Sequence, residues 1–450
     1  MPLTTDLLYN NNNHTQREHM KNRKFTAMIA AVGMASIAMA ACSSTKKAAD
    51  TTAAKAADTT AAKAADTTAA KAAATTVAKA ADTTAAAAQT TAAAAADTTV
   101  AAASASGDLK KVKLQLQWVT QAQFAGYFAA VDQGFYKAAG LDVQILEGGV
   151  DIVPQTQLAT GAVDYAIAWV PKALASREQG AGITDVAQIF QRSGTLQVSF
   201  KDANITKGVD LKGKKVGNWG FGNEFELFAG MTKGGLDPAK DVTLVQQQFD
   251  MQALLKKEID AAQAMVYNEY AQVLEAKNPA TGKLYTPADF NAINWNDEGT
   301  AMLQDAIWAN TDKLKDAAYQ DQTVKFIKAS IQGWVFCRDN ADKCVDIVVS
   351  KGSKLGKSHQ TWQMNEINKL IWPSPAGVGM IDQKAWDQTV AVAQSAKNAE
   401  GATVLTKAPE GLAFTNDYVT KALDEWKAAK VDVTGATFKP ATVTLNEGGA

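Results

Sequence analysis

The chain has 450 residues and a formal net charge of −1, with 45 basic and 46 acidic side chains. Binding to phosphates needs clustered lysine and arginine, and no basic block follows the N-terminal segment, so the composition excludes a nucleic-acid partner. With only 3 histidines and 3 cysteines, neither a zinc site nor a Ser/His/Asp set can be assembled. We therefore predict no catalytic residue, no metal and no cofactor.

Residues 20–41 have the pattern of a secretory lipoprotein signal: a basic start, a short apolar stretch and small residues directly before Cys42. The apolar stretch is shorter than the roughly 20 residues of a membrane-spanning helix. We expect cleavage before Cys42, a lipid on its thiol, and a mature protein anchored outside the cytoplasmic membrane, on its outer face. Met39 stands where such signals usually carry Leu, and an ordinary signal peptide is the alternative. Residues 1–19 are interpreted as an upstream start-codon artefact.

Residues 42–106 follow as a low-complexity segment rich in Ala, Thr, Lys and Asp. An eight-residue unit is seen at residues 48–55 and again at residues 56–63. The unit holds almost no large apolar side chain, so it cannot bury a core. We predict a flexible tether that would span roughly 45 Å as a coil, with partial helix as the alternative.

The remainder, from residue 107 to residue 450, carries all 10 tryptophans and therefore the packed core. It is long enough for one large or two medium domains. Outside the cytoplasm, a pair of nearby thiols such as Cys337 and Cys344 is more often a disulfide than a metal or redox site. Two unpaired buried thiols are the alternative.

Strand and helix patterns alternate at the start of this region. Strands are expected at residues 111–117, 141–145 and 163–169, and helices at residues 120–134 and 152–160. Thr120 and Gln123 are predicted to form a capping box for the first helix. This alternation predicts a parallel sheet with crossover helices, whose ligands lie at the carboxyl ends of the strands. The loops at those ends are residues 118–121, 147–151 and 169–172.

A second series of the same kind begins near residue 211. Strands are expected at residues 214–219, 241–246 and 261–266, and a helix at residues 251–258. Asn223 is predicted to cap another helix after a glycine turn. With helices from residue 301 onward, we predict an α/β fold of two lobes with mostly parallel sheets and a ligand cleft between them. Residues 107–195 and 301–450 form lobe I, and residues 196–300 form lobe II.

Several segments of the chain resemble solute-binding proteins of vitamin ABC importers. These segments are residues 116–128, 134–136, 140–143, 220–226, 267–270 and 371–375. The resemblance extends over nearly all of residues 107–427. It implies a periplasmic-binding-protein fold, a monomer, an ABC permease as partner and a small vitamin-like ligand. The runs resemble most the branch that binds riboflavin or the thiamine pyrimidine precursor. Residues 118–128, 148–154 and 168–180 resemble the riboflavin-binding member most.

The acidic residues at the start of the helix after Asn223 indicate the charge of the ligand. Glu224 and Glu226 occupy the positive end of this helix, so they favour a ligand that donates hydrogen bonds over a sulfonate or nitrate anion. Helix capping is the alternative for both carboxylates. Tyr267, Asn268 and Glu269 follow a predicted strand and offer an aromatic ring and two polar groups, with a satisfied polar turn as the alternative.

The remaining candidates are aromatic rings and hydrogen-bond donors. Trp118, Tyr127, Trp169 and Trp295 are candidates for a clamp around a flat ring, although Tyr127 lies on an apolar helical stripe typical of core packing. Gln121, Asn223 and Arg192 are the candidate donors. The predicted ligand-binding set is Trp118, Gln121, Tyr127, Trp169, Arg192, Asn223, Glu224, Tyr267, Asn268, Glu269 and Trp295.

An enzymatic role is not predicted. The superfamily that the chain resembles includes an enzyme that consumes its own histidine, with pyridoxal phosphate bound to a lysine, to make the thiamine pyrimidine. Past residue 20 this chain has a single histidine, His359, which is predicted to lie at the surface or to cap a helix. The predicted location also lacks a supply of that cofactor. A structural surface lipoprotein is the other non-enzymatic alternative.

Overall fold

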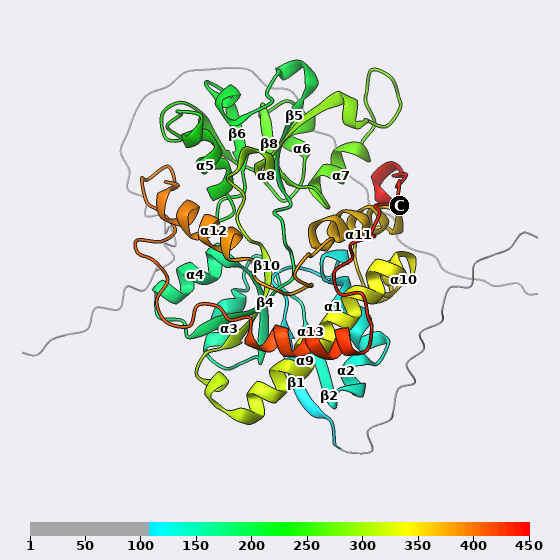
Figure 1. Cartoon of the computed structure of the whole chain (residues 1–450). Coiled ribbons are helices and arrows are strands. Elements are labelled where there is room, and N and C mark those ends of the chain that lie inside the picture. Colours follow the sequence, from blue (N-terminus) through cyan, green and yellow to red (C-terminus); the bar gives the residue numbers. More distant parts are fainter. Residues whose placement is uncertain (1–107) are drawn as a thin grey trace, which may run out of the picture. The chain divides into compact units, whose positions relative to one another are not determined.

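The computed structural model describes residues 108–450, which form two lobes that each contain a five-stranded sheet (Figure 1). The predicted signal at residues 20–41, the lipidation of Cys42, the tether at residues 42–106 and the segment 1–19 lie outside the described residues. Within residues 108–450, no helix combines the length and the apolar character that a membrane span requires.

The sheet of lobe I combines strands from two separate parts of the chain. It contains β1 (Lys110–Gln115), β2 (Leu141–Leu146), β3 (Tyr165–Trp169), β4 (Ile183–Gln188) and β10 (Asp305–Asn310), in the order β2-β1-β3-β10-β4. β1 runs parallel to β2 and β3, and β10 runs antiparallel to β3 and β4. The alternation that predicts β1 reflects burial on one face, since Val112 and Leu114 are buried and Lys113 between them is exposed.

The sheet of lobe II comes from one continuous part of the chain. It contains β5 (Thr195–Phe200), β6 (Lys215–Asn218), β7 (Thr243–Gln246), β8 (Ala261–Met265) and β9 (Phe290–Asn294), in the order β7-β6-β8-β5-β9. β6 runs parallel to β7 and β8, whereas β5 runs antiparallel to β8 and β9.

The predicted α/β fold is confirmed, but the prediction of mostly parallel sheets is wrong, because each sheet has two parallel and two antiparallel strand pairings. The prediction of helices from residue 301 onward misses β10, because every residue of this strand except Asn310 is buried and the sequence shows no alternation. β10 lies between β3 and β4 and carries the chain back into the first sheet after lobe II. The chain passes to the second sheet between Gln188 and Thr195 and returns between Asn294 and Asp305.

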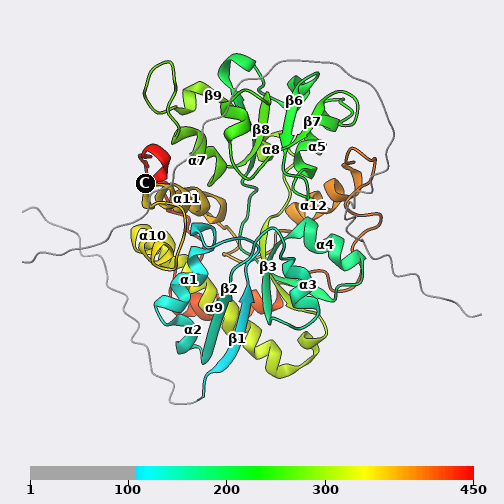
Figure 2. The same ribbon diagram turned by 180° about the vertical axis from the view of Figure 1, so that it is seen from behind.

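Helices cover both sheets, as the two opposite views show (Figures 1 and 2). Around lobe I these are α1 (Ala125–Asp132), α2 (Phe135–Ala138), α3 (Pro154–Ala159), α4 (Val170–Glu178), α9 (Ala317–Asp339), α10 (Ala341–Ser350), α11 (Lys357–Ile371), α12 (Gln383–Ser395) and α13 (Asp417–Ala428). Lobe II carries α5 (Phe225–Lys233), α6 (Gln252–Leu255), α7 (Glu269–Leu274) and α8 (Trp295–Glu298). Short 3-10 helices are η1 (Ala122–Phe124), η2 (Lys201–Ala203), η3 (Gly208–Leu211), η4 (Pro287–Asp289), η5 (Lys313–Lys315) and η6 (Glu447–Gly449).

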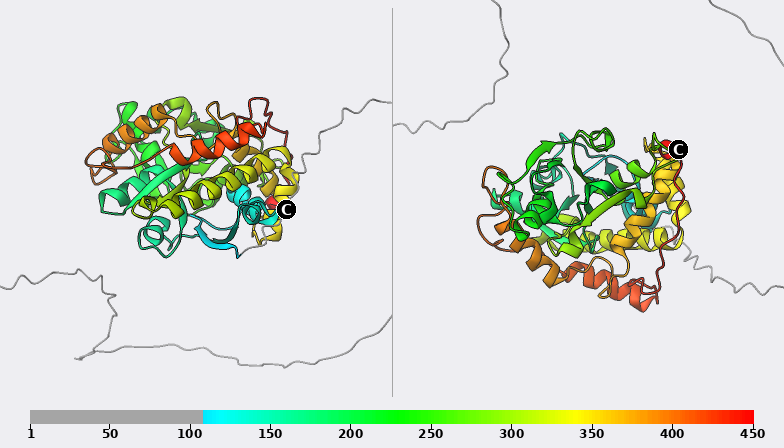
Figure 3. Two further views of the ribbon diagram at one scale, coloured as in Figure 1. Left: turned by 60° about the horizontal axis from the view of Figure 1, so that its bottom comes forward. Right: turned by 90° about the horizontal axis from the view of Figure 1, so that it is seen from above.

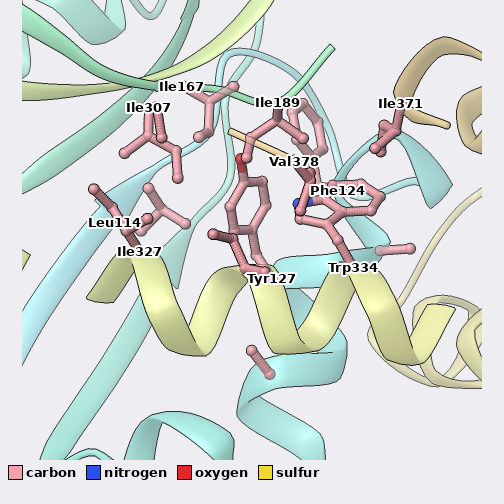
Figure 4. Packing of buried hydrophobic residues seen from close by; sticks show 14 of the residues in the cluster. Leu114, Phe124, Tyr127, Ile167, Ile189, Ile307, Ile327, Trp334, Ile371 and Val378 are labelled. Carbon is pink, nitrogen blue, oxygen red and sulfur yellow. The ribbon is translucent and has the colours of Figure 1, made fainter. Parts of the chain in front are cut away.

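The long helix α9 organises the core of lobe I. It packs beside α1 and α13, and Figure 3 shows α9 and α13 running side by side. Figure 4 shows Tyr127 of α1 and Trp334 of α9 among buried aliphatic side chains. Gly126 and Gly333 allow this approach, because a β-carbon on Gly333 would overlap the carbonyl oxygen of Gly126. Cys337 and Cys344 form a disulfide that joins α9 to α10.

Candidate ligand-binding site

A cavity of about 550 Å³ lies between the two lobes. Its walls come from the loops that follow β1, β2 and β3 in lobe I and β6, β7 and β8 in lobe II. These loops lie at the carboxyl ends of their strands, where ligands bind in open α/β sheets. The loops at residues 118–121, 147–151 and 169–172, selected from the sequence, all contribute to the lining.

One wall of the cavity is an aromatic cluster that joins the lobes. Trp118 of lobe I lies 4.9 Å from Phe249 of lobe II, measured between ring centroids, with the planes tilted by 53°. Phe249 in turn stacks on Trp219 at 6.0 Å and 21°. All three rings line the cavity. They offer flat apolar surfaces from both lobes to a planar ligand.

The buried carboxylate of Asp305, which lies behind the cavity lining, accepts hydrogen bonds from three side chains of that lining. Asp305 Oδ1 accepts hydrogen bonds from Gln117 Nε2 at 2.6 Å and from Trp169 Nε1 at 2.9 Å. Its Oδ2 accepts from Gln123 Nε2 at 3.0 Å. Burial raises the pKa of Asp305 to about 7, although the three donors oppose this shift. Asp305 opens β10, so the strand that the sequence reading misses also carries this residue.

Lys172 supplies a positive charge to the cavity wall. Its Nζ lies 5.2 Å from the centroid of the Trp169 ring. Burial lowers the pKa of Lys172 to about 8, although the negative charges of Glu224 and Asp305 act in the opposite direction. Glu224 does not line the cavity. Its Oε2 atom is buried without a hydrogen-bond partner in residues 108–450, and burial raises its pKa.

The loop after β8 brings three predicted residues to the cavity, Tyr267, Asn268 and Glu269. Asn268 Nδ2 donates to Glu269 Oε1 at 2.8 Å. The second oxygen of Glu269 accepts from the backbone N–H of Met265 at 2.9 Å. Burial raises the pKa of Glu269 to about 7.

Three buried polar atoms of the lining have no hydrogen-bond partner among the described residues. Two are acceptors, Gln121 Oε1 and Gln155 Oε1, and one is a donor, Trp219 Nε1. Gln121 uses its amide nitrogen for a 2.6 Å bond to Gln123 Oε1, which leaves its carbonyl oxygen free. Buried polar groups are seldom left unpaired, so these three atoms lack the partners that such groups usually have.

Besides Glu224, three predicted ligand residues do not line the cavity, and we remove all four from the candidate lining. Tyr127 is buried in the core of lobe I with its ring edge-on to Trp334 at 5.6 Å, as its apolar stripe indicates. Trp295 is fully buried against Gly230 of α5. Arg192 lies in the segment that connects β4 to β5. Its Nη2 donates to the carbonyl oxygen of Pro373 at 2.8 Å.

Two predicted helix caps do not form. Thr120 donates its backbone N–H to Glu147 Oε1 at 2.6 Å, and η1 has no side-chain cap, so no capping box with Gln123 exists. Asn223 lines the cavity but donates to the carbonyl oxygen of Gly220 at 2.8 Å instead of capping α5. At Thr120 a tertiary partner, Glu147, replaces the predicted local bond, whereas at Asn223 another local bond, within the glycine turn, replaces it.

His359 is also not where the sequence places it. It is 1% exposed, in the first turn of α11, rather than on the surface. Its Nδ1 lies 2.8 Å from Glu275 Oε1 and its Nε2 lies 3.0 Å from Asn268 Oδ1. The polar sequence around it gives no sign of this burial, because both partners come from lobe II.

The sequence reading also omits several residues of the cavity. Phe249 and Phe221 follow β7 and β6 in lobe II, and Val153 follows β2 in lobe I. Phe221 is 68% exposed, with a φ of 55° that a bulky residue rarely adopts. The signal in the sequence that could have identified Phe221 was its position between two glycines, Gly220 and Gly222. In residues 108–450, no group of three potential ligands could hold a metal ion.

Comparison with known proteins agrees with this architecture. Residues 121–344 match the model of a family described as NMT1/THI5 like. The chain carries a domain of the NMT1/THI5-like family. This family segment includes every cavity loop from η1 to the start of α7.

Two curated proteins are similar to the NMT1/THI5-like chain over most of their length. The riboflavin-binding protein RibY of Chloroflexus aurantiacus is 26% identical over 330 residues, which are 70% of this chain and 88% of the relative. A formylaminopyrimidine-binding protein of Halalkalibacterium halodurans is 20% identical over 250 residues, which are 55% of this chain and 73% of the relative.

A solved structure supports the fold. It is described as a putative sulfonate ABC transporter, periplasmic sulfonate-binding protein SsuA, from Methylobacillus flagellatus KT. The likeness has a TM-score of 0.50 at 18% identity and covers 75% of this chain and 99% of that chain. The NMT1/THI5-like chain therefore has the two-lobed α/β fold of periplasmic binding proteins.

Proposed function

We propose that this protein is the substrate-binding component of an ABC importer and that it captures a planar N-heterocyclic vitamin, riboflavin. Ligand binding would favour a closed form that docks on the permease. Lipidation at Cys42 would hold the protein outside the cytoplasmic membrane, and residues 42–106 would tether the two lobes to it. The curated relative RibY, whose name states riboflavin binding, supports this ligand.

The aromatic cluster with unpaired acceptors beside it is the observation that carries the proposal. Trp118, Phe249 and Trp219 offer ring faces from both lobes. The unpaired oxygens of Gln121 and Gln155 need donors, and riboflavin offers an imide N–H and the hydroxyl groups of its ribityl chain. Stacking a flat ring while pairing these oxygens satisfies both features of the cavity.

The size of the cavity favours riboflavin over a single ring. A volume of about 550 Å³ falls within the usual range for sites that bury a drug-sized ligand. A pyrimidine would fill only part of it. The thiamine pyrimidine precursor stays as the second candidate, because the relative from Halalkalibacterium halodurans is named for formylaminopyrimidine binding. Its amino group could also donate to the unpaired oxygens.

The charges around the cavity argue against a sulfonate or nitrate ligand. Lys172 is the one cationic side chain of the described lining, and burial lowers its pKa to about 8. Glu269 lines the same cavity, and the carboxyl groups of Glu224 and Asp305 act on Lys172. An anion in the cavity would lie beside the carboxyl group of Glu269, with one lysine to balance both negative charges.

We also propose binding rather than catalysis. His359 has both ring nitrogens engaged with Glu275 and Asn268, and it does not line the cavity. A general base must reach the proton that it removes, and His359 does not reach the cavity.

The test is a titration of the full chain with riboflavin, with the formylated aminopyrimidine and with an alkanesulfonate. Saturable quenching of flavin emission with submicromolar affinity is expected for riboflavin. A thermal shift with the pyrimidine and no flavin binding would replace the first candidate by the second. A response to the sulfonate alone would contradict the proposed ligand class.

A further inference from the structure

Exposed apolar side chains gather at the cavity between the lobes. Within residues 108–450, seven large apolar side chains are exposed, and four of them line this cavity. From lobe I they are Val150, Ile152 and Val153, all in the loop between β2 and α3. From lobe II the fourth is Phe221, in the loop between β6 and α5. We call these four residues the apolar mouth, because scattered exposed apolar residues are ordinary but a cluster of them marks a binding surface.

The turn that carries Phe221 fixes the backbone of this residue. Its φ of 55° lies between two glycines, Gly220 and Gly222, whose φ values of 69° and 80° also belong to the left-handed region. On one side of the turn, the N–H of Gly220 donates to Asn218 Oδ1 at 3.0 Å. On the other side, Asn223 Nδ2 donates to the carbonyl oxygen of Gly220 at 2.8 Å. A bulky residue keeps such a conformation where its surroundings impose it, which is common at binding sites.

The polar groups of the lining are buried, in contrast to the apolar mouth. Gln121 is 2% exposed and Gln155 is 5% exposed, and each has an oxygen without a partner among the described residues. Asn268 and Glu269, which also line the cavity, are buried as well. The cavity therefore has hydrogen-bonding groups in its interior and apolar side chains at its opening. A planar ligand with one polar edge and one apolar edge fits such a cavity in a single orientation.

We propose that Phe221 is a specificity-determining residue, and that the apolar mouth contacts the dimethylbenzene edge of riboflavin while the imide edge of the ligand faces the buried oxygens. The inference rests on the proposed function. The two edges lie at opposite ends of the flat ring system, so the apolar edge points to the opening when the imide edge enters the interior. Burial of apolar surface at the mouth then favours flavins that carry both ring methyl groups. A single pyrimidine that pairs with the same oxygens leaves the apolar mouth uncovered.

The first experiment changes the protein and the ligand together. The Kd values of riboflavin and of didemethylriboflavin, the analogue that lacks both ring methyl groups, are measured in the full chain and in Phe221→Ala. The full chain is expected to bind riboflavin at least about threefold more tightly than the analogue, and Phe221→Ala is expected to lose most of this preference. Because the side chain of Phe221 is exposed, its removal takes away little packing and the variant is expected to fold.

The matched control is Leu412→Ala, because Leu412 is also a large exposed apolar residue but does not line the cavity. This variant is expected to keep the preference of the natural chain for riboflavin over didemethylriboflavin. An unchanged preference in Phe221→Ala would overturn the inference and leave the proposed function intact. If neither flavin binds to the full chain, the proposed function fails and the inference fails with it.

The second experiment tests the orientation of the ligand in the natural chain. One riboflavin analogue carries a bulky alkylamino group in place of a methyl group on the benzene ring, and another carries a methyl group on the imide nitrogen. The first is expected to bind within about threefold of riboflavin, because its substituent lies at the opening. The second is expected to bind at least about tenfold more weakly, because it has lost the imide donor and leaves a buried oxygen unpaired. The reverse order of affinities would overturn the inference.

Discussion

Trp118 illustrates how one residue can be selected from the sequence for a physical reason. It follows the predicted strand of β1 directly, and the carboxyl ends of such strands converge on the cleft. The structure places its ring in the cavity against Phe249. Tyr127 is equally aromatic but belongs to an apolar helical stripe, and it lies in the core. Position relative to a strand end separates the two rings better than residue type does.

Replacement of Trp118 tests the aromatic wall. Trp118→Ala is expected to weaken ligand binding at least about tenfold, or about 1.4 kcal/mol, because it removes a ring face from lobe I. Titration by flavin quenching measures the effect. Trp386→Phe, in α12 and outside the cavity, is the matched control and is expected to keep the natural affinity. Natural affinity in Trp118→Ala would contradict the site.

Asp305 makes the stability of the ligand-free protein depend on pH. Its folded-state pKa is raised by burial from 3.8 to about 7, so its contribution is fully present below its ordinary pKa and is lost as the pH rises towards 7. The free energy of unfolding is expected to fall between pH 4 and pH 7, and Asp305→Asn is expected to reduce this slope. Urea unfolding at each pH measures it, and an unchanged slope in the variant would contradict the assignment.

At the scale of elements, the contact between α1 and α9 depends on two small residues. Gly126 and Gly333 let the helix backbones approach, and Trp334 packs over Gly126. Since α1 continues from η1, this packing also positions Gln121 and Gln123 at the cavity. The periodicity of apolar residues predicts both helices, but their close approach is a property of the pair.

Gly333→Ala tests that approach. The added methyl group would overlap the carbonyl oxygen of Gly126, so we expect a loss of about 1–3 kcal/mol in the free energy of unfolding, measured with urea. Gly182→Ala is the control, because its added methyl group meets no atom within 4 Å. The control is expected to stay within about 0.5 kcal/mol of the natural chain. Equal effects of the two substitutions would argue against close helix packing.

At the scale of the whole molecule, Glu226 links α5 to both segments that connect the lobes. Its Oε2 accepts from Ser193 Oγ at 2.8 Å, and its Oε1 accepts from the backbone N–H of Met302 at 2.6 Å. Gln304 completes the network by donating to Ser193 Oγ at 2.9 Å. Helix capping is the alternative role for Glu226 in the sequence analysis, but no side chain caps α5. The Glu226 carboxylate instead holds together the two chain segments that connect the lobes, through Ser193 in one and Met302 in the other.

Removal of this carboxylate is expected to destabilise the molecule. Glu226→Ala leaves the donors of Ser193 and Met302 unpaired in a buried place, at a cost of about 1–3 kcal/mol. Chemical unfolding measures the loss. Asp297→Ala removes an exposed carboxylate of the neighbouring α8 and is expected to change stability by less than about 0.5 kcal/mol. A similar small change in both variants would contradict the proposed role of the network.

Local chemistry in the sequence determined the alternation of Val112 and Leu114 in β1, the strands β1 to β3 and β6 to β8, and the loops that supply Trp118, Trp169 and Asn268. These features follow from periodicity, which acts over a few neighbouring residues. Only the tertiary structure decided the place of β10, the burial of His359 and the role of Asp305. Each depends on partners far away in the chain, and a buried strand or a paired carboxylate has no periodic signal of its own.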